Sequence, residues 1–318
     1  MSLLEVRDLT VEFPTRRGIL RALDRISFKI EAGEILGMVG ESGAGKSLTG
    51  VSIVGLLERP GRIASGEIRL NDTRIDNLAP EPMRRIRGRR IGMIFQDPLT
   101  TLNPLHTIGH QLIETMQTHL PLSDSEARKK ALEWLDRVGI PAAAQRIDAY
   151  PHEFSGGQRQ RVVIALALCA EPSLVIADEP TTALDVSIQA QIITLLKTLT
   201  KDHHTAVMLI THDMGVIAET ADRVAVMYAG RIAEIGPVAN VIRHPAHPYT
   251  EGLMASIPSL EHRVERLRQI DGSMPRLDAL PRGCRFNPRC AKAFDRCQTD
   301  QPELLPAGPT QAACWLHA

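Results

Sequence analysis

The sequence has no net charge, no long apolar run and no basic leader, and each absence excludes a class of protein. Lys plus Arg number 37 and Asp plus Glu number 37, so no overall charge favours binding to nucleic acid or to an anionic membrane surface. A membrane-spanning helix needs roughly 18 to 20 apolar residues, and the longest apolar run, Val162 to Ala170, has about half of them. The start of the chain has no basic segment followed by an apolar core, so we expect no signal peptide and a cytoplasmic location.

Cysteine is also scarce, and its placement is uneven. A cytoplasmic chain of 318 residues with five cysteines is not expected to contain a disulfide framework. Cys169 stands alone, whereas Cys284, Cys290, Cys297 and Cys314 crowd the C-terminus. This cluster therefore needs a separate explanation.

One loop fits the pattern G-x-x-x-x-G-K-[ST] at every specified position. Glycines let successive backbone N–H groups turn toward an anion, where a side chain would block the approach. Lys46 would reach the outer phosphates of a nucleotide, and the hydroxyl of Ser47 would bind Mg²⁺. An apolar run, Ile35 to Val39, precedes the loop as a buried strand would, and helical character follows it. We call these residues the phosphate loop: Gly40, Glu41, Ser42, Gly43, Ala44, Gly45, Lys46 and Ser47.

A second nucleotide element is predicted at the end of an apolar strand, Leu174 to Ala177. Ligands of open α/β sheets bind at the carboxyl edge of the strands, and this strand ends at Asp178 and Glu179. Asp178 would organise Mg²⁺ through water, and Glu179 would polarise the attacking water as a general base.

A third element begins a helix. Ser155, Gly156, Gly157 and Gln158, which we call the signature segment, precede the apolar stretch Val162 to Ala170. A helix N-terminus with bare glycines and a hydroxyl is a second phosphate-binding surface. One bound nucleotide would leave one of the two surfaces unused, whereas two chains facing head to tail would use both.

The pattern along the chain favours an α/β fold with a mainly parallel sheet. Residues 3 to 36 alternate as a strand-rich, antiparallel lobe would. Residues 98 to about 151 are helical in character, with a capping box at Ser123 and Glu126. Further strands are expected at 174–177 and 206–210, and a hairpin at 224–235. A small, proline-punctuated segment begins near residue 259.

These motifs together resemble the nucleotide-binding subunit of ABC transporters, in the order that the family has. The phosphate loop looks like the family's Walker A, and Leu174 to Glu179 like its Walker B strand. Gln96 resembles the glutamine that touches Mg²⁺ and senses the transmembrane partner. The signature segment resembles the motif that contacts ATP bound to the other subunit, although Phe154 stands where Leu is usual. The remaining likenesses are Ala183-Leu184-Asp185 to the D-loop, His212 to the switch histidine on the γ-phosphate, and Phe13 to an aromatic that stacks on adenine.

Some of these residues also have plainer interpretations. Phe13 can also be a core aromatic, and a single His such as His212 is often structural. The spacing of the four C-terminal cysteines is not that of common zinc sites, so spacing alone identifies no metal. The nearby arginines either offset the charge of a thiolate cluster or form a solvated basic face; they are Arg276, Arg282, Arg285, Arg289 and Arg296.

The stretch Cys284 to Cys290, with the later cysteines, resembles the C-terminal extension of oligopeptide and dipeptide importer ATPases. Tyr228 and His247-Pro248-Tyr249-Thr250 agree with that subfamily. The resemblance implies a [4Fe-4S] cluster on Cys284, Cys290, Cys297 and Cys314, with zinc or free thiols as alternatives.

The resemblance implies a P-loop ABC-type ATPase core over residues 1–258, with an inserted helical subdomain at about 98–168 and the extension at 259–318. The implied activity is ATP hydrolysis that powers the uptake of dipeptides or oligopeptides across the inner membrane. ATP and Mg²⁺ are the implied ligands. The implied partners are two transmembrane permeases, a homologous second ATPase and a solute-binding protein, with no nucleic acid, and the implied place is the cytoplasmic face of that membrane.

Two alternatives stay open from the sequence. Within transport, the solute could be nickel or glutathione, because other subunits select it. In another class, the chain would be a soluble ABC ATPase acting in iron–sulfur assembly, or on nucleic acid or the ribosome; the balanced charge counts against the last two.

Overall fold

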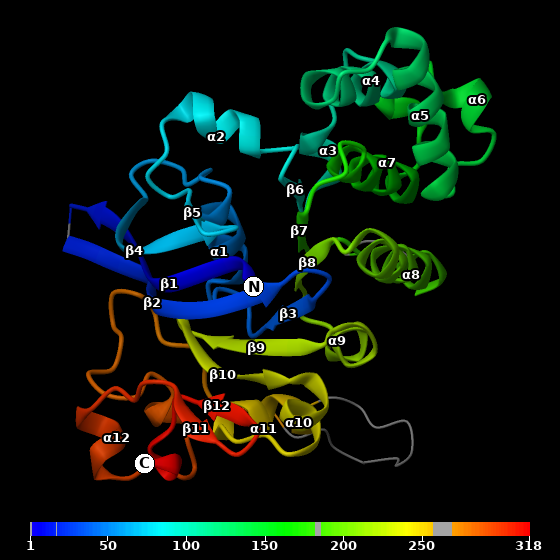
Figure 1. Cartoon of the computed structure of the whole chain (residues 1–318). Coiled ribbons are helices and arrows are strands. Elements are labelled where there is room, and N and C mark those ends of the chain that lie inside the picture. The colour runs from blue at the N-terminus through cyan, green and yellow to red at the C-terminus, as the bar shows by residue number, and fades with distance from the viewer. Residues whose placement is uncertain (1, 17, 182–185, 257–268) are drawn as a thin grey trace. The chain divides into compact units, whose positions relative to one another are not determined.

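The structure is a computed structural model, and its chain divides into two compact units (Figure 1). Within the described residues, no helix is both long enough and apolar enough to cross a bilayer. The described residues are 2–16, 18–181, 186–256 and 269–318. Unit 1 comprises Glu31–Glu34 and Asn77–Ile210, and unit 2 comprises Ser2–Ile30, Ile35–Asp76 and Thr211–Ala318.

Unit 1 is built on parallel strands in the order β8-β7-β6. These are β6 (Ile91–Ile94), β7 (Leu174–Asp178) and β8 (Ala206–Ile210). Every residue of β7 and β8 is buried, which explains why these strands are continuous apolar runs rather than alternating ones. The helices of unit 1 are α2 (Pro80–Ile86), α3 (Pro98–Thr101), α4 (Ile108–His119), α5 (Asp124–Arg137), α6 (Ala143–Arg146), α7 (Gly156–Leu168) and α8 (Val186–His203), with a 3₁₀ turn, η1, at Pro151–Glu153.

Side-chain caps fix where the unit 1 helices begin. The Ser123 hydroxyl accepts from the Glu126 N–H, and the Glu126 carboxylate accepts from the Ser123 N–H. This reciprocal pair satisfies two backbone donors that a helix start leaves open, and it confirms the capping box expected from the sequence. Thr107 caps α4 in a similar way, through the His110 N–H.

Unit 2 contains an antiparallel sheet in the order β2-β1-β4-β5. In its register, Leu4 lies opposite Leu70 and Val6 opposite Ile68, and all four side chains are buried. One face of this sheet is therefore core. The strands are β1 (Ser2–Thr15), β2 (Gly18–Glu31), β4 (Arg62–Leu70) and β5 (Thr73–Arg74).

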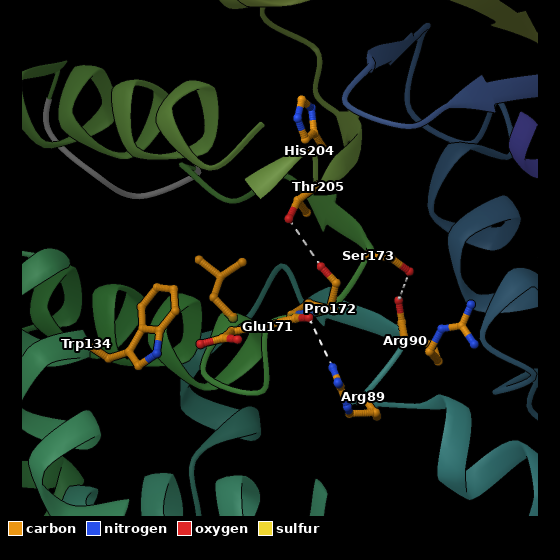
Figure 2. A pocket seen from close by; sticks show the side chains of 9 residues that line it. Arg89, Arg90, Trp134, Glu171, Pro172, Ser173, His204 and Thr205 are labelled. Atoms are coloured by element: carbon orange, nitrogen blue, oxygen red, sulfur yellow. Dashed lines mark hydrogen bonds between the residues drawn. The ribbon is translucent and has the colours of Figure 1, made fainter. Parts of the chain in front are cut away.

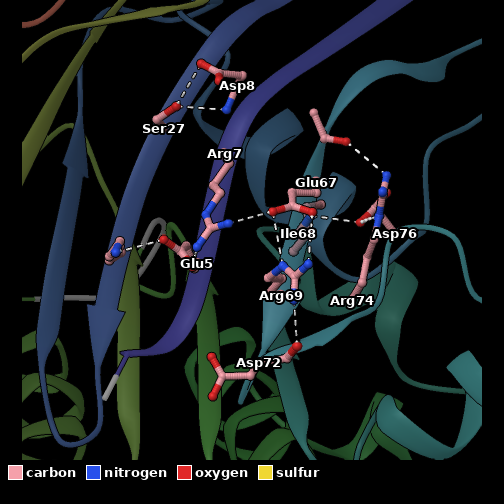
Figure 3. Close-up of polar contacts among 12 residues, drawn as sticks. Glu5, Arg7, Asp8, Ser27, Glu67, Ile68, Arg69, Asp72, Arg74 and Asp76 are labelled. Atoms are coloured by element: carbon pink, nitrogen blue, oxygen red, sulfur yellow. Dashed lines mark hydrogen bonds and ion pairs between the residues drawn. The ribbon is translucent and has the colours of Figure 1, made fainter.

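Polar side chains brace neighbouring strands of the same sheet (Figure 3). Arg7 pairs with Glu5 on its own strand and with Glu67 on β4, at 2.6 and 2.9 Å. Hydrogen bonds from Arg7 and Lys29 lower the pKa of Glu5 to about 2. Glu5 therefore stays ionised at any ordinary pH.

A second sheet of unit 2 has the order β11-β12-β10-β9-β3, with β3 parallel to β9 and the other pairs antiparallel. Its strands are β3 (Ile35–Val39), β9 (Arg223–Tyr228), β10 (Arg231–Pro237), β11 (Leu305–Ala307) and β12 (Thr310–Ala312). The helices of unit 2 are α1 (Lys46–Ile53), α9 (Met214–Thr220), α10 (Val238–Arg243), α11 (Pro248–Ala255) and α12 (Asp295–Thr299), with 3₁₀ turns η2 (Asn287–Arg289) and η3 (Trp315–His317).

The expected strands at 35–39, 174–177 and 206–210 and the hairpin at 224–235 are all present. The expected boundary between core and extension, at residue 259, falls in the range 257–268, which lies outside the described residues. The domain limits therefore stay a prediction.

Candidate functional site

The phosphate loop lies in unit 2, between the buried strand β3 and the helix α1. The Nζ of Lys46 donates to the carbonyl oxygens of Gly40 and Glu41, at 2.9 and 3.1 Å. The side chain of Lys46 is buried, so its ammonium is fixed over the loop rather than extended into water. An anion bound by the loop's N–H groups would meet this charge directly.

Two glycines of the phosphate loop cannot be replaced without moving the backbone. Gly40 has φ of 148°, and a Cβ there would lie 2.2 Å from the carbonyl oxygen of Met227. Gly45, the residue that caps α1, has φ of 105° and would clash with Leu23 at 2.6 Å. The motif's glycines are thus required by the neighbouring chain as well as by any bound phosphate.

The C-terminal part of unit 2 also contacts the phosphate loop. The hydroxyl of Tyr249 accepts from the Glu41 N–H at 3.0 Å, and Nη1 of Arg289 lies 3.0 and 3.1 Å from the two carboxylate oxygens of Glu41. In the sequence, Arg289 stands among the arginines around the cysteines, and no motif assigns a chemical role to Tyr249. No sequence signal links either residue to the loop, because they lie more than 200 positions from Glu41.

The acidic pair lies in unit 1, at the carboxyl end of β7. Asp178 is 6% exposed. The backbone of Glu179 has the left-handed φ of 46°, and its carboxylate accepts a hydrogen bond of 3.0 Å from Nε2 of Gln96. The structure therefore brings together Gln96 and Glu179, which the sequence separates by 82 residues.

The signature segment forms the first turn of α7, in unit 1. The Ser155 hydroxyl accepts from the Gln158 N–H, and the Gln158 side chain accepts from the Ser155 N–H. Ser155 and Gly156 are exposed, and a Cβ at Gly156 would meet nothing within 4 Å. A helix N-terminus is thus presented to solvent, as a phosphate-binding surface requires.

The remaining candidate residues are His212, Phe13 and Asp185. His212 is exposed and directly precedes Asp213, whose carboxylate caps α9. Phe13 is half-buried, and its ring packs so closely on Gly61 that a Cβ there would lie 2.7 Å away. Asp185, with the rest of Ala183-Leu184-Asp185, lies outside the described residues.

The C-terminal cysteines do not support the [4Fe-4S] expectation. Cys297 and Cys314 are buried, and Cys284 and Cys290 are partly buried, with all four thiols free. Burial, with a smaller contribution from the other three thiols, raises the pKa of Cys284 to about 11. Among the described residues, however, no three His, Cys, Asp or Glu side chains are grouped as metal ligands. The thiols are neighbours, but they are not arranged as a coordination shell.

Two of the arginines near the cysteines are held by carboxylates, so the five do not form one solvated basic face. Arg285 is buried against Asp24 at 2.6 Å, and Arg289 pairs with Glu41. Arg296 stacks on Trp315, with its guanidinium 3.6 Å from the ring centroid. Arg276 pairs with Asp278 at the surface.

A cavity of about 340 Å³ in unit 1 carries no comparable chemistry (Figure 2). Its polar lining is used to brace the backbone. Arg89 donates to the Ala170 carbonyl, the Ser173 hydroxyl donates to the Arg90 carbonyl, and the Thr205 hydroxyl donates to the Pro172 carbonyl.

Comparison with known protein families gives two matches. Residues 23–182 match the family described as "ABC transporter". Residues 233–297 match the family described as "Oligopeptide/dipeptide transporter, C-terminal region".

Individual relatives match almost the whole chain. It is 48% identical to the oligopeptide transport ATP-binding protein AppD of Bacillus subtilis (strain 168), over 96% of this chain and 93% of AppD. It is 44% identical to the dipeptide transport ATP-binding protein DppD of Escherichia coli (strain K12), over 99% and 96%.

Solved structures agree. A dimeric post-hydrolysis state of the ATP-binding cassette MJ0796, bound to ADP and Pi, matches with a TM-score of 0.68 and 29% identity, over 74% of this chain and 98% of that one. Cassette cbiO1 from Clostridium perfringens, part of an ABC transporter complex, matches with a TM-score of 0.65 and 29% identity, over 76% and 91%.

Proposed function

The chain belongs to the ABC transporter family, with the family's P-loop ATPase fold, and from this premise we propose that it is the ATP-hydrolysing subunit of a peptide importer. Its ATP hydrolysis is coupled to transport. The observation that supports a peptide cargo is the match to AppD and DppD, which continues through the C-terminal region. The solute is proposed to be a dipeptide or oligopeptide.

Within this function, each predicted site residue has a proposed role. The phosphate loop binds the ATP phosphates, with Lys46 on the outer phosphates and Ser47 on Mg²⁺. Asp178 organises Mg²⁺ through water, and Glu179 polarises the attacking water. Gln96 contacts Mg²⁺ and orients Glu179, which its present hydrogen bond supports. His212 contacts the γ-phosphate, and Phe13 stacks on adenine. Asp185 and the signature segment contact ATP that is bound by a second subunit.

The proposed assembly has two ATPase subunits, two transmembrane permeases and a solute-binding protein. Two ATP molecules lie between the phosphate loop of one ATPase and the signature segment of the other. Closure of this pair drives the permeases, and hydrolysis resets them. The chain would then act at the cytoplasmic face of the membrane. The second ATPase is proposed to be a homologue rather than a copy.

Isolation of the native complex tests this proposal. We expect a tagged chain, recovered from gently solubilised membranes, to bring with it two permeases and a second ATPase, identified by mass. Ribosomes, DNA or cluster-assembly proteins in their place would overturn the transport function and leave ATP binding intact. The identity of the solute-binding protein would separate peptide from nickel or glutathione uptake.

The iron–sulfur cluster is a separate proposal that rests on the family resemblance alone: four thiols are enough for a Cys₄ set, but in the described residues they are not grouped as metal ligands. Protein purified without oxygen should contain iron and absorb broadly near about 400 nm. If both signals are missing, the cluster is refuted, and the ATPase function is unaffected.

A further inference from the structure

Glu41 of the phosphate loop forms an ion pair with Arg289, a residue 248 positions later in the sequence. Nη1 of Arg289 lies 3.0 and 3.1 Å from the two carboxylate oxygens. The Arg289 side chain is only 7% exposed and that of Glu41 is 30% exposed. Water therefore screens this pair much less than a surface salt bridge.

Arg289 is itself fixed by several further contacts. Its Nε donates to the Asp271 carbonyl at 2.9 Å and its Nη2 to the Ile270 carbonyl at 3.2 Å. Its Nη1 also donates to the Tyr228 hydroxyl at 3.3 Å. The guanidinium thus cannot follow Glu41 if the loop moves, because three other groups of unit 2 also accept from its donors.

The backbone of Glu41 is fixed as well, by Tyr249. The hydroxyl that accepts from the Glu41 N–H belongs to a fully buried ring. That ring packs on Tyr228 and on Phe286, with centroid distances of 4.6 and 5.4 Å. Phe286 lies three residues before Arg289, so one turn of the C-terminal segment, residues 269–318, supports both contacts to Glu41.

We propose that Arg289 is a positioning residue for ATP, which fixes Glu41 and thereby the shape of the phosphate loop, so that the C-terminal segment sets the affinity for nucleotide. This inference rests on the proposed function, in which the phosphate loop binds ATP. Lys46 connects Glu41 to the phosphate-binding site. Its ammonium donates to the Glu41 carbonyl, so a displacement of Glu41 would move the ammonium away from its place over the loop.

The test uses the full chain and four substitutions. Arg289→Gln removes the charge, and Arg289→Lys keeps the charge without the planar guanidinium. Glu41→Gln, and the double variant that combines it with Arg289→Gln, complete a double-mutant cycle. Arg276→Gln is the matched control, because this arginine belongs to the same segment and, among the described residues, pairs with the exposed Asp278 rather than with the phosphate loop. Two quantities are measured: the Kd for MgATP, and the hydrogen exchange of residues 40–47 without nucleotide.

We expect Arg289→Gln to raise the Kd about tenfold, equivalent to about 1.4 kcal/mol, because a hydrogen bond to a charged group is lost. Exchange in residues 40–47 should quicken. The double variant should bind no more weakly than the weaker single variant, Arg289→Lys should recover part of the affinity, and Arg276→Gln should match wild type.

The inference is overturned if Arg289→Gln binds MgATP and exchanges like wild type, or if Arg276→Gln changes the Kd as much. If the wild-type chain itself does not bind MgATP, the proposed function fails and this inference fails with it. If wild type binds and only the exchange changes in Arg289→Gln, ATP binding stands and the positioning role is refuted.

Discussion

At the scale of single residues, the backbone and the side chain of Glu179 are both held in place by neighbouring groups. Its φ of 46° lies in the left-handed region, which costs a non-glycine residue free energy. Its N–H donates to the Ile210 carbonyl at 2.9 Å, and Gln96 donates to its carboxylate. Such backbone strain is kept where surrounding contacts over-determine it, which suits a base that must point in one direction.

We predict that Glu179→Gln keeps MgATP affinity near the wild-type value and slows hydrolysis by roughly 10²- to 10⁴-fold, because a positioned base is lost. The measurement is single-turnover hydrolysis in the assembled complex, beside equilibrium ATP binding. Glu171→Gln is the control: it also has a left-handed backbone, with φ of 54°, but it is exposed and pairs with Lys130. Near-normal turnover in Glu179→Gln would refute the role of base.

The structural setting of the candidate residues was predictable from sequence where it depends on local neighbours. The phosphate loop, the acids after β7 and the Ser155 cap each depend on neighbours within a few positions. The contact of Arg289 with Glu41 could not be predicted, because either residue alone has many ordinary explanations. Only the folded chain brings them within hydrogen-bonding distance.

At the scale of elements, α11 begins at a buried histidine. The Nδ1 of His247 accepts from the Tyr249 N–H at 3.0 Å, which caps the helix. The backbone N–H of His247 donates to a carboxylate oxygen of Glu234 at 2.9 Å. Burial, with a smaller contribution from the nearby His317, lowers the pKa of His247 to about 4. The folded chain therefore contains a neutral imidazole.

This histidine predicts a loss of stability in acid. The unfolded chain takes up a proton near pH 6.5, whereas the folded chain resists protonation down to about pH 4. Stability from His247 is thus complete above about pH 6.5 and is lost as the pH falls toward 4. Between pH 7 and 5 we expect a decrease of about 2 kcal/mol in the free energy of unfolding.

Urea unfolding of wild type and His247→Asn at pH 7, 6 and 5 measures this effect. Asn can still cap the helix but does not titrate, so its pH dependence should be weaker by about the same 2 kcal/mol. His244→Asn, at an exposed histidine of the same connection, should keep the wild-type slope. Parallel slopes for wild type and His247→Asn would contradict the assignment.

Helices and strands were predictable from the sequence where their pattern of apolar residues is clear. β3 and β8 match the expected ranges because a buried parallel strand is an uninterrupted apolar run bounded by polar residues. β11 and β12 were missed. Each has three residues, too few to show a period, and their pairing with β10 is a tertiary effect.

At the scale of the whole molecule, the C-terminal segment is part of the sheet and core of unit 2. β12 pairs with β10, with Glu234 opposite Ala312. Arg285 donates to Asp24 at 2.6 Å and also to the Ala229 carbonyl, while Arg231 donates to the same Asp24 oxygen at 2.9 Å. Burial opposes ionisation of Asp24, but the two arginines lower its pKa overall. All three side chains are buried.

We therefore predict that a chain ending at residue 258 does not keep the stability of the full chain. Removal of Arg285 leaves Asp24 with one buried partner, and breaking a buried pair costs about 3 to 5 kcal/mol. The loss of β12 also exposes the edge of β10, which favours aggregation. Melting temperature and solubility of the two chains measure this.

Arg285→Gln separates the ion pair from the lost strands, because it keeps β11 and β12 and removes one charge. It should lower the melting temperature by several degrees, whereas Arg282→Gln, at an exposed position, should not. A truncated chain as stable and soluble as the full one would show the opposite arrangement, in which residues 259–318 form an independent appendage. The sequence alone favours that arrangement, because its composition becomes rich in proline and in loop-forming residues near residue 259. Nothing in the sequence indicates that this segment pairs with β10.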